Sequence, residues 1–345
     1  MTNSRTAIPI SDKRDIQSGI VKSNGKDYSN YIFIRVENIR ETITIIKYIT
    51  QSIQSHYSQE RRTKQYRISK HNRFIKNNNL YKKLKNNFNI NIGLSPCAIR
   101  EISPTDENNP DDFSFQSGFN DNFQIRLSGF YEILKTASPI DQLLYYDNFS
   151  DPDFERYHIY ISIHCDSKKR LKNKTITILN KVKHLTKNNI FIRLQTGFTL
   201  RRGKKQIEHF GFADGLSEST PMISKYKQTF IESRSKITNN GTYLFFLKLE
   251  QDLDAFNKHL LDFQNLLKIN KVNNVDTKKI KSLILGRTPE GIPLLTKKDS
   301  KRLSQNINYF DFSNDPLGET CPFHAHIRAL NNRTKKDSIL EIAFS

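Results

Sequence analysis

Apolar residues at two characteristic spacings predict alternating strands and helices along the first half of the chain. Residues 31–36 (YIFIRV) are rich in β-branched and aromatic side chains, which is typical of a strand. Isoleucines then recur three or four positions apart between residues 39 and 53, which predicts a helix. After a basic, Asn-rich connection, residues 88–93 (FNINIG) alternate as a half-buried strand does, and Ser95 can cap a short helix. These stretches predict a first β-α-β unit.

The same order of elements recurs after a polar insertion over residues 104–155, where clusters of Pro, Asp and Asn are typical of loops. Residues 158–164 (HIYISIH) place three isoleucines on one strand face. Residues 167–187 have the spacing of an amphipathic helix, and residues 190–195 (IFIRLQ) favour another strand. Because two β-α-β units that share one antiparallel sheet form a ferredoxin-like domain, we expect this fold in the first half.

The second half begins with a similar pattern. Residues 241–250 (GTYLFFLKLE) predict a strand, and leucines and phenylalanines between residues 253 and 267 form one helical stripe. Asp276 or Thr277 can cap a further helix, and Gly286 stands where a helix C-terminal glycine is expected. This order is again consistent with an α+β domain.

We therefore predict an α+β protein with two ferredoxin-like domains that contain antiparallel sheets. The expected divisions are a flexible tail over residues 1–15, an N-terminal domain over residues 16–196 and a C-terminal domain over residues 197–345. The length suits two domains of roughly 100–200 residues each. With 14 Tyr and 23 Phe, the chain also has enough apolar surface to build packed cores.

The chain carries a formal net charge of +20, which attracts nucleic acid, anionic lipid or anionic substrates. Basic residues gather at residues 61–85 and 168–187, but the second run has helical spacing and is typical of a solvated helix face. No recognised nucleic-acid motif is present, so we do not expect nucleic acid to be the main partner. A basic nucleic-acid-binding protein remains an alternative.

Cysteine usage and hydropathy bear on location. The chain has three cysteines, an odd and sparse set that argues for a reducing compartment. The first fifteen residues lack an apolar segment typical of a secretory signal, and no stretch approaches 18 apolar residues. We therefore expect a cytoplasmic protein without a membrane span.

Two stretches carry candidate chemistry. In CPFHAHIR, residues 321–328, a thiol and two imidazoles fall within six positions. Zinc on Cys321, His324 and His326 is one interpretation, since on a strand the two histidines would share a face, but no fourth ligand is evident.

In EHFGFADGLS, residues 208–217, Asp214 stands between close glycines beside apolar rings that would raise its pKa. The alternative there is a plain Asp-Gly turn.

These stretches and their flanks resemble the dye-decolorising peroxidases, a family of haem enzymes built from two ferredoxin-like domains. The hallmark is a GxxDG motif, which appears here within EHFGFADGLSESTP. The preceding TGFTLRRGKKQ, the following NGTYLFFLKLEQDLDAF, then LGRTPEGIPLL and finally NYFDF with CPFHAHIR occur in the family's order. The opening RDIQSGIV also matches. The resemblance spans roughly residues 15–333, and several ordered motifs are far more specific than GxxDG alone.

The resemblance implies roles for particular residues. His326 corresponds to the proximal haem ligand, and Asp214 to the distal acid/base that moves a proton during peroxide cleavage. Arg287 matches an arginine near the haem edge that could pair with a propionate, although an arginine that satisfies helix C-terminal carbonyls is the plain alternative. Phe212 and Gly215 would line the cofactor site in the second domain.

The implied cofactor is one haem b per chain, and the implied partners are hydrogen peroxide and an aromatic electron donor. Ligation of haem by the Cys-Pro thiolate of Cys321 remains a further alternative. The resemblance also leaves room for a homo-oligomer.

The family pattern breaks at the C-terminus. The family has a distal arginine about twenty residues after the proximal histidine, in a stretch like RRGIPYG, whereas this chain has SILEIAFS with Glu341. Because such preorganised groups are typically worth around 10²–10³ in rate, we expect a weakened peroxidase. We also expect the second domain to lack its final elements. A truncated, non-catalytic relative is therefore a second interpretation.

Overall fold

The computed structural model describes the chain in segments that form two compact units. The first unit comprises Met1–Phe198 and Pro221–Phe246, and the second comprises Thr199–Thr220 and Leu247–Ser345. The described residues are 10–20, 25–71, 87–102, 157–187, 190–203, 205–213, 244, 251–272, 274–295 and 312–329.

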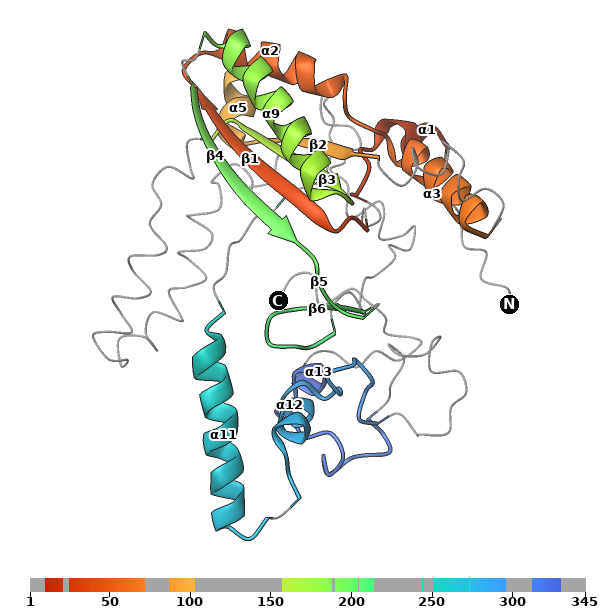
Figure 1. Ribbon diagram of the computed structural model, residues 1–345, viewed down its shortest axis with the longest axis vertical. Coiled ribbons are helices and arrows are strands. Elements are labelled where there is room, and N and C mark those ends of the chain that lie inside the picture. The colour runs from red at the N-terminus through yellow and green to blue at the C-terminus, as the bar shows by residue number, and fades with distance from the viewer. Residues whose placement is uncertain are drawn as a thin grey trace, which may run out of the picture. The chain divides into compact units, whose positions relative to one another are not determined.

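The first unit contains a four-stranded sheet with the strand order β2-β3-β1-β4 (Figure 1). All three strand pairs in this sheet are antiparallel. Its elements in chain order are α1 (Ile10–Asp15), β1 (Tyr28–Val36), α2 (Ile39–Thr50), α3 (His56–His71), β2 (Asn89–Leu94), α5 (Pro96–Ile102), β3 (Ile159–Cys165), α9 (Lys168–Leu185) and β4 (Ile190–Phe198). This is the ferredoxin-like arrangement that the two β-α-β patterns predict.

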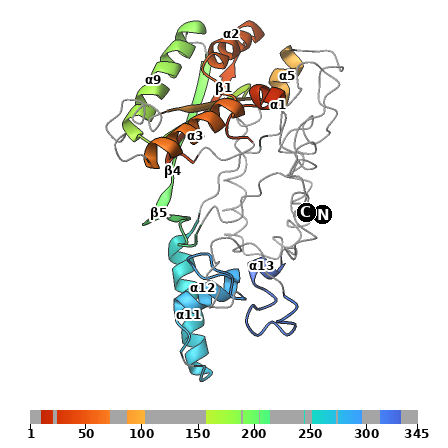
Figure 2. The same cartoon turned by 90° about the vertical axis from the view of Figure 1, so that its right-hand side faces the viewer.

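Helices α2 and α9 cover one face of this sheet (Figure 2). The alternating isoleucines of β1 and β3 meet in register, with Ile32 paired to Ile161. Ile45 of α2 and Ile178 of α9 pack onto the same fully buried cluster. The helix starts follow ordinary capping rules, since the Ser167 hydroxyl accepts a hydrogen bond from a first-turn backbone N–H of α9. The core thus forms where the apolar periodicities coincide.

Two helices differ from the sequence-based expectation. Helix α1 lies within residues 1–15, for which the sequence predicts a tail, and α3 occupies residues assigned to a polar connection. An apolar stripe reveals neither helix, because α1 has only six residues and α3 is polar on all sides. Long-range contacts support both helices: Lys13 pairs with Glu60 at 2.8 Å, and the backbone N–H of His56 donates to the carbonyl of Ile16.

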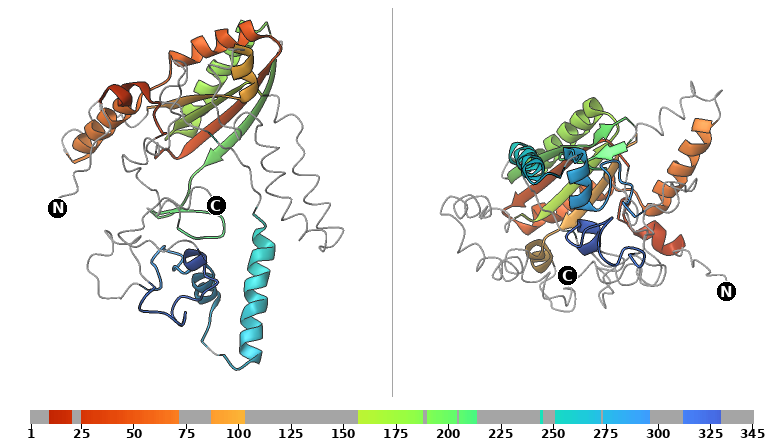
Figure 3. Two further views of the ribbon diagram at one scale, coloured as in Figure 1. Left: turned by 180° about the vertical axis from the view of Figure 1, so that it is seen from behind. Right: turned by 90° about the horizontal axis from the view of Figure 1, so that it is seen from below.

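The described part of the second unit contains a short hairpin and three helices (Figure 3). The elements are β5 (Leu200–Arg202), β6 (Lys205–Ile207), α11 (Leu253–Ile269), α12 (Thr277–Leu285) and α13 (His326–Ala329). Asp276 caps α12, and Gly286 ends it in the left-handed region, as the sequence predicts. The strand predicted at residues 241–250 lies outside the described residues apart from Leu244. None of the described helices is long and apolar enough to cross a membrane.

Candidate functional site

The glycine-containing motif forms a tight turn around the carboxylate of Glu208. Its two oxygens accept hydrogen bonds from the backbone N–H groups of Phe210 and Phe212, each at 2.7 Å. Gly211 at the corner has φ +92°, a conformation that favours glycine. Phe212 is half-buried, whereas Asp214 and Gly215 lie outside the described residues. The described part of the turn ends at Ala213, directly before Asp214 in the sequence.

This turn is attached to α12 and to the loop that follows it. Lys281 of α12 donates a hydrogen bond to the carbonyl of Phe210 at 2.9 Å. The backbone N–H of Ala213 donates to the carbonyl of Pro289 at 2.8 Å. Residues 208–213 and residues 287–293, two motifs separated by more than seventy positions, are thereby brought together.

Arg287 lies at the start of this loop, directly after Gly286. Its side chain is buried, and its Nη1 donates a hydrogen bond to the carbonyl of Gly291 at 3.0 Å. The loop closes on itself through a hydrogen bond from the backbone N–H of Thr288 to the carbonyl of Ile292. Arg287 thus stabilises its own turn, and its pairing with a propionate stays a prediction.

The third motif, residues 321–328, packs against the same loop. Gly286 lies against the side chains of Ile327 and Cys321, and these two residues are buried together with Ala325. Three partly buried residues complete the cluster: Leu294, Leu295 and Phe312. All three motifs therefore meet around the C-terminal end of α12 within one unit.

A buried ion pair fixes the shape of this third motif. Arg328 donates hydrogen bonds from Nη1 to the carboxylate of Asp315 at 2.8 Å and from Nη2 to the Asp315 carbonyl at 2.6 Å. Its guanidinium carbon also lies 4.8 Å and 4.5 Å from the ring centres of Phe312 and Phe323. Backbone N–H groups of Cys321 and Thr320, together with Arg328, hold the pKa of Asp315 below its ordinary value.

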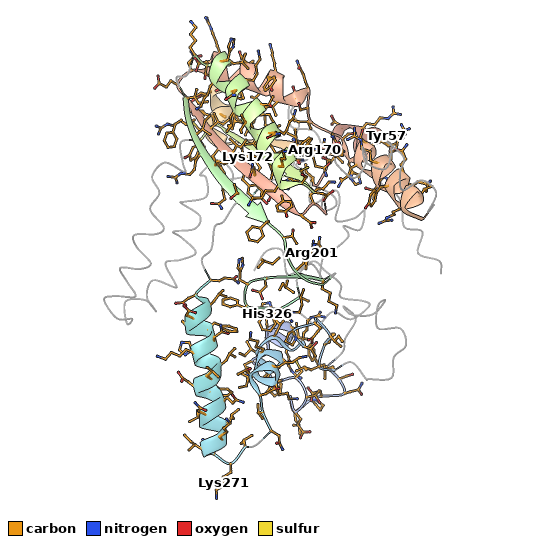
Figure 4. The ribbon with its side chains drawn as sticks, viewed as in Figure 1. Tyr57, Arg170, Lys172, Arg201, Lys271 and His326 are labelled. Carbon is orange, nitrogen blue, oxygen red and sulfur yellow. The ribbon has the colours of Figure 1, made fainter. Side chains whose placement is uncertain are left out.

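His326 is the first residue of the short helix α13 and is exposed (Figure 4). The stretch is thus a turn followed by a helix, and the strand geometry considered for His324 and His326 is not observed. No described residue hydrogen-bonds the His326 ring, so both nitrogens remain available to a ligand within this part of the structure.

Cys321 differs from its two neighbouring histidines in accessibility. Its thiol is buried against Gly286, and burial raises its pKa, so the neutral thiol is favoured over the thiolate. His324 and His326 are both exposed. The ligand atoms of Cys321, His324 and His326, all three among the described residues, do not come together within 4.8 Å, so the described geometry does not support a zinc cluster on them.

Among the described residues, one group brings three metal-binding side chains together: the ligand atoms of Cys97, Glu101 and His158 lie within 4.8 Å of one another. The backbone N–H of Val36 donates to Nδ1 of His158 at 3.2 Å, so the neutral ring carries its proton on Nε2. That nitrogen lies 3.3 Å from Oε1 of Glu101. A metal on Nε2 would have to displace that one ring proton and leave an imidazolate, so we interpret the group as a hydrogen-bonded link between α5 and the residue before β3.

Glu208, Asp315 and Arg328 were not recognised as site residues from the sequence. All three act through backbone groups, which sequence spacing does not reveal. The sequence gives only a weak signal for these three residues. Each is ionisable and close to the glycine turn or the histidine motif, and a charge that becomes buried requires a partner.

Comparison with known proteins supports the motif resemblance, although no family model matches the chain. The chain is 28% identical over 149 residues to the multifunctional dye peroxidase DyP2 of Amycolatopsis sp.. It is 30% identical over 153 residues to the dye-decolorizing peroxidase msp1 of Mycetinis scorodonius. These matches cover 37% and 36% of this chain and only 32% and 29% of the two relatives, so the matched stretch spans about a third of their length.

Solved structures match a larger part of the chain. DyP2 from Amycolatopsis sp. aligns with 95% of this chain and 69% of its own, with a TM-score of 0.67 and 18% identity. The DyP-type peroxidase of Anabaena sp. aligns with 93% and 72%, with a TM-score of 0.62 and 18% identity. The predicted ferredoxin-like α+β fold is confirmed, and so is the resemblance to the dye-decolorising peroxidases.

Proposed function

We propose that this chain, a relative of the dye-decolorising peroxidases, is a haem-dependent peroxidase that uses hydrogen peroxide to oxidise dye-like or phenolic donors. The observation that carries the proposal is the meeting of three motifs in one unit. Ala213 is hydrogen-bonded to Pro289, and Gly286 packs against Ile327. The segments that lead to the acid, the buried arginine and the histidine therefore share one small region.

The residues of this region fit a haem ligand. His326 is exposed and its ring is not hydrogen-bonded by any described residue, whereas the Cys321 thiol is fully buried against Gly286. An imidazole, rather than a thiolate, would thus hold one haem b per chain. When bound, haem supplies the iron that splits the O–O bond of peroxide and accepts electrons from the donor.

The carboxylate of Asp214 would take a proton from peroxide and return it to the leaving oxygen, directly or through one water. The turn built on Glu208 would set its position, and Phe212 and Gly215 would line the cofactor site beside it. Arg287 would stand at the cofactor edge, where a guanidinium can pair with a propionate.

We propose in addition that turnover is weakened, because Glu341 stands where the family has its distal arginine. Loss of one preorganised charge-stabilising group typically costs around 10²–10³ in rate. Glu341→Arg should therefore raise the rate of peroxide-dependent oxidation without changing haem affinity, and an unchanged rate would remove this part of the proposal.

The proposal is tested by titrating the purified chain with haem and following the Soret band, then adding peroxide and a dye. His326→Ala should weaken haem binding, whereas His324→Ala, which removes a neighbouring exposed imidazole, should not. Asp214→Asn should keep the Soret band and lower turnover at least tenfold.

Absence of any Soret shift, or equal loss with both histidine variants, would overturn the haem assignment. A normal Soret band without peroxide turnover would instead indicate a non-catalytic relative that keeps the cofactor.

A further inference from the structure

Helix α9 in the first unit carries many positively charged side chains and no negatively charged ones. Its eighteen residues include seven Lys and Arg and no Asp or Glu. Six of these cations are exposed: Lys168, Lys169, Arg170, Lys172, Lys181 and Lys183. Arg40 and Lys47 of α2, on the same side of the sheet, are exposed as well. Arg170 and Lys172 are labelled on α9 in Figure 4.

Packing uses the opposite side of α9. Leu171, Thr175, Ile178 and Val182 are buried against the sheet, and this stripe accounts for the amphipathic pattern of the helix. Ile176 is the one large apolar side chain of the described residues in α9 that remains exposed. The outer face is therefore polar and cationic, without an apolar surface of its own.

The stability of the helix does not explain this charge pattern. Cations at a helix N-terminus are unfavourable with respect to the helix dipole, and the first turn of α9 has three of them and no acid. Asp166, two residues before the helix, is already paired with Lys26 at 2.6 Å. Helix α11, in the same basic chain, mixes Asp254 and Asp262 with its lysines, so composition alone does not impose an acid-free helix.

We propose that the outer face of α9 is a nucleic-acid-binding surface that contacts the phosphate backbone. Arg170 and Lys181 are eleven residues apart, as are Lys172 and Lys183. Eleven residues are close to three helical turns, so each pair shares a direction and spans about 16 Å, with Arg170 and Lys181 on one flank of the exposed side and Lys172 and Lys183 on the other. Duplex DNA carries one phosphate charge per about 1.7 Å of its axis, so both ends of the face can meet phosphates of one duplex at once.

The same observations disfavour two other anionic partners. A helix that binds a membrane surface inserts an apolar face, and the apolar stripe of α9 is already buried in the protein. Protein interfaces depend on buried aromatic or arginine anchors. The one arginine of α9 already packs within its own unit, with its guanidinium carbon 5.3 Å from the ring centre of Phe88. Backbone phosphates need only positive charge and hydrogen-bond donors, which this face supplies.

The test measures the fluorescence anisotropy of a labelled 20-base-pair DNA duplex with the full chain at 50–300 mM NaCl. Neutralisation of four to six phosphates predicts a log–log salt slope of about −4 to −5. The variant Lys172→Gln/Lys181→Gln/Lys183→Gln should weaken binding at least tenfold at 100 mM salt and reduce the slope by about 3. The double variant Lys172→Gln/Lys183→Gln should reduce the magnitude of the salt slope by about 2.

A matched control removes the same charge from the second unit by Lys258→Gln/Lys268→Gln/Lys271→Gln, three exposed positions in and just after α11. Glutamine is nearly as good a helix former as lysine, so both variants should fold, which circular dichroism verifies. The control should bind DNA as the parent chain does. Equal weakening by both triple variants, no binding at 50 mM salt, or binding only to phosphatidylserine vesicles would each overturn the proposal.

Discussion

Gly286 lies directly against Ile327, and this contact joins the end of α12 to the histidine motif. A Cβ atom at Gly286 would overlap Cγ1 of Ile327 and would lie 2.9 Å from its Cδ1 and 3.1 Å from the sulfur of Cys321. Gly286 also has φ +79°. The position therefore requires glycine twice, once for its backbone conformation and once for the space that a side chain would fill.

Gly286→Ala should lower the free energy of unfolding of the second unit by about 2–5 kcal/mol. A left-handed penalty of about 1–2 kcal/mol adds to an overpacking cost of about 1–3 kcal/mol. Gly203→Ala is the control, because Gly203 has φ +63° but no atom within 4 Å of the position that a Cβ would take, so only the backbone penalty should appear. Urea denaturation measures both. Equal losses would show that the contact with Ile327 contributes nothing.

Arg328→Lys should destabilise the turn that precedes His326 even though the charge is retained. Lysine cannot bond the Asp315 carboxylate and carbonyl together, and it lacks the planar group that stacks between Phe312 and Phe323. We expect a lower urea midpoint for the second unit and at least threefold weaker haem binding, because the motif would no longer be held in one conformation.

The matched variant for this pair is Lys278→Ala, which removes an exposed ion pair with Glu290 from the same unit. Exposed pairs of this kind contribute at most about 1 kcal/mol. A larger effect of Lys278→Ala than of Arg328→Lys, on either midpoint or haem affinity, would contradict the importance assigned to the buried pair.

The first unit should lose stability as the pH falls from about 6.5 to about 4. Burial in β3 lowers the pKa of His164 to about 4, below its ordinary value of 6.5. Between these two values the unfolded chain binds more protons than the folded one, so acid favours unfolding, by roughly 3 kcal/mol at most. Burial also lowers the pKa of His56, which adds to the slope.

His164→Gln should flatten the pH dependence of the urea midpoint between pH 7 and pH 5, whereas His184→Gln, at an exposed position of α9, should leave it unchanged. A slope that persists undiminished in His164→Gln would assign the effect to other groups.

Local sequence signals predicted much of the fold, because they act over a few residues. Ser95 accepts a hydrogen bond from the backbone N–H of Ala98, and Asp276 accepts one from that of Lys279. Both caps follow from residue type and position alone. The sequence does not reveal helix α3, because its stability comes from distant contacts, such as the pair of Glu60 with Lys13 47 positions away, rather than from an apolar stripe.

The candidate site was predictable as a set of motifs but not as a geometry. Nothing in the spacing of Ala213 and Pro289 indicates that their backbones are hydrogen-bonded. The same holds for Lys281 and the carbonyl of Phe210, which lie 71 positions apart. Such contacts depend on how separate elements pack, and a single sequence carries no direct record of them. The roles of His326, Asp214 and Arg287 therefore stay predictions that rest on resemblance.

Glu208→Gln should impair the proposed peroxidase activity by loosening the turn before Asp214. An amide has one acceptor oxygen in place of the two that now bind the N–H groups of Phe210 and Phe212, so one partly buried donor loses its partner. The loss of a hydrogen bond to a charged group costs about 1.5–3 kcal/mol. We expect kcat/KM for peroxide to fall at least tenfold while the Soret band stays in place, since His326 is untouched.

Glu290→Gln, which changes an exposed carboxylate of the same unit, is the control and should leave both readings unchanged. If Glu208→Gln removes the Soret band together with activity, the turn supports the whole haem site rather than the position of Asp214.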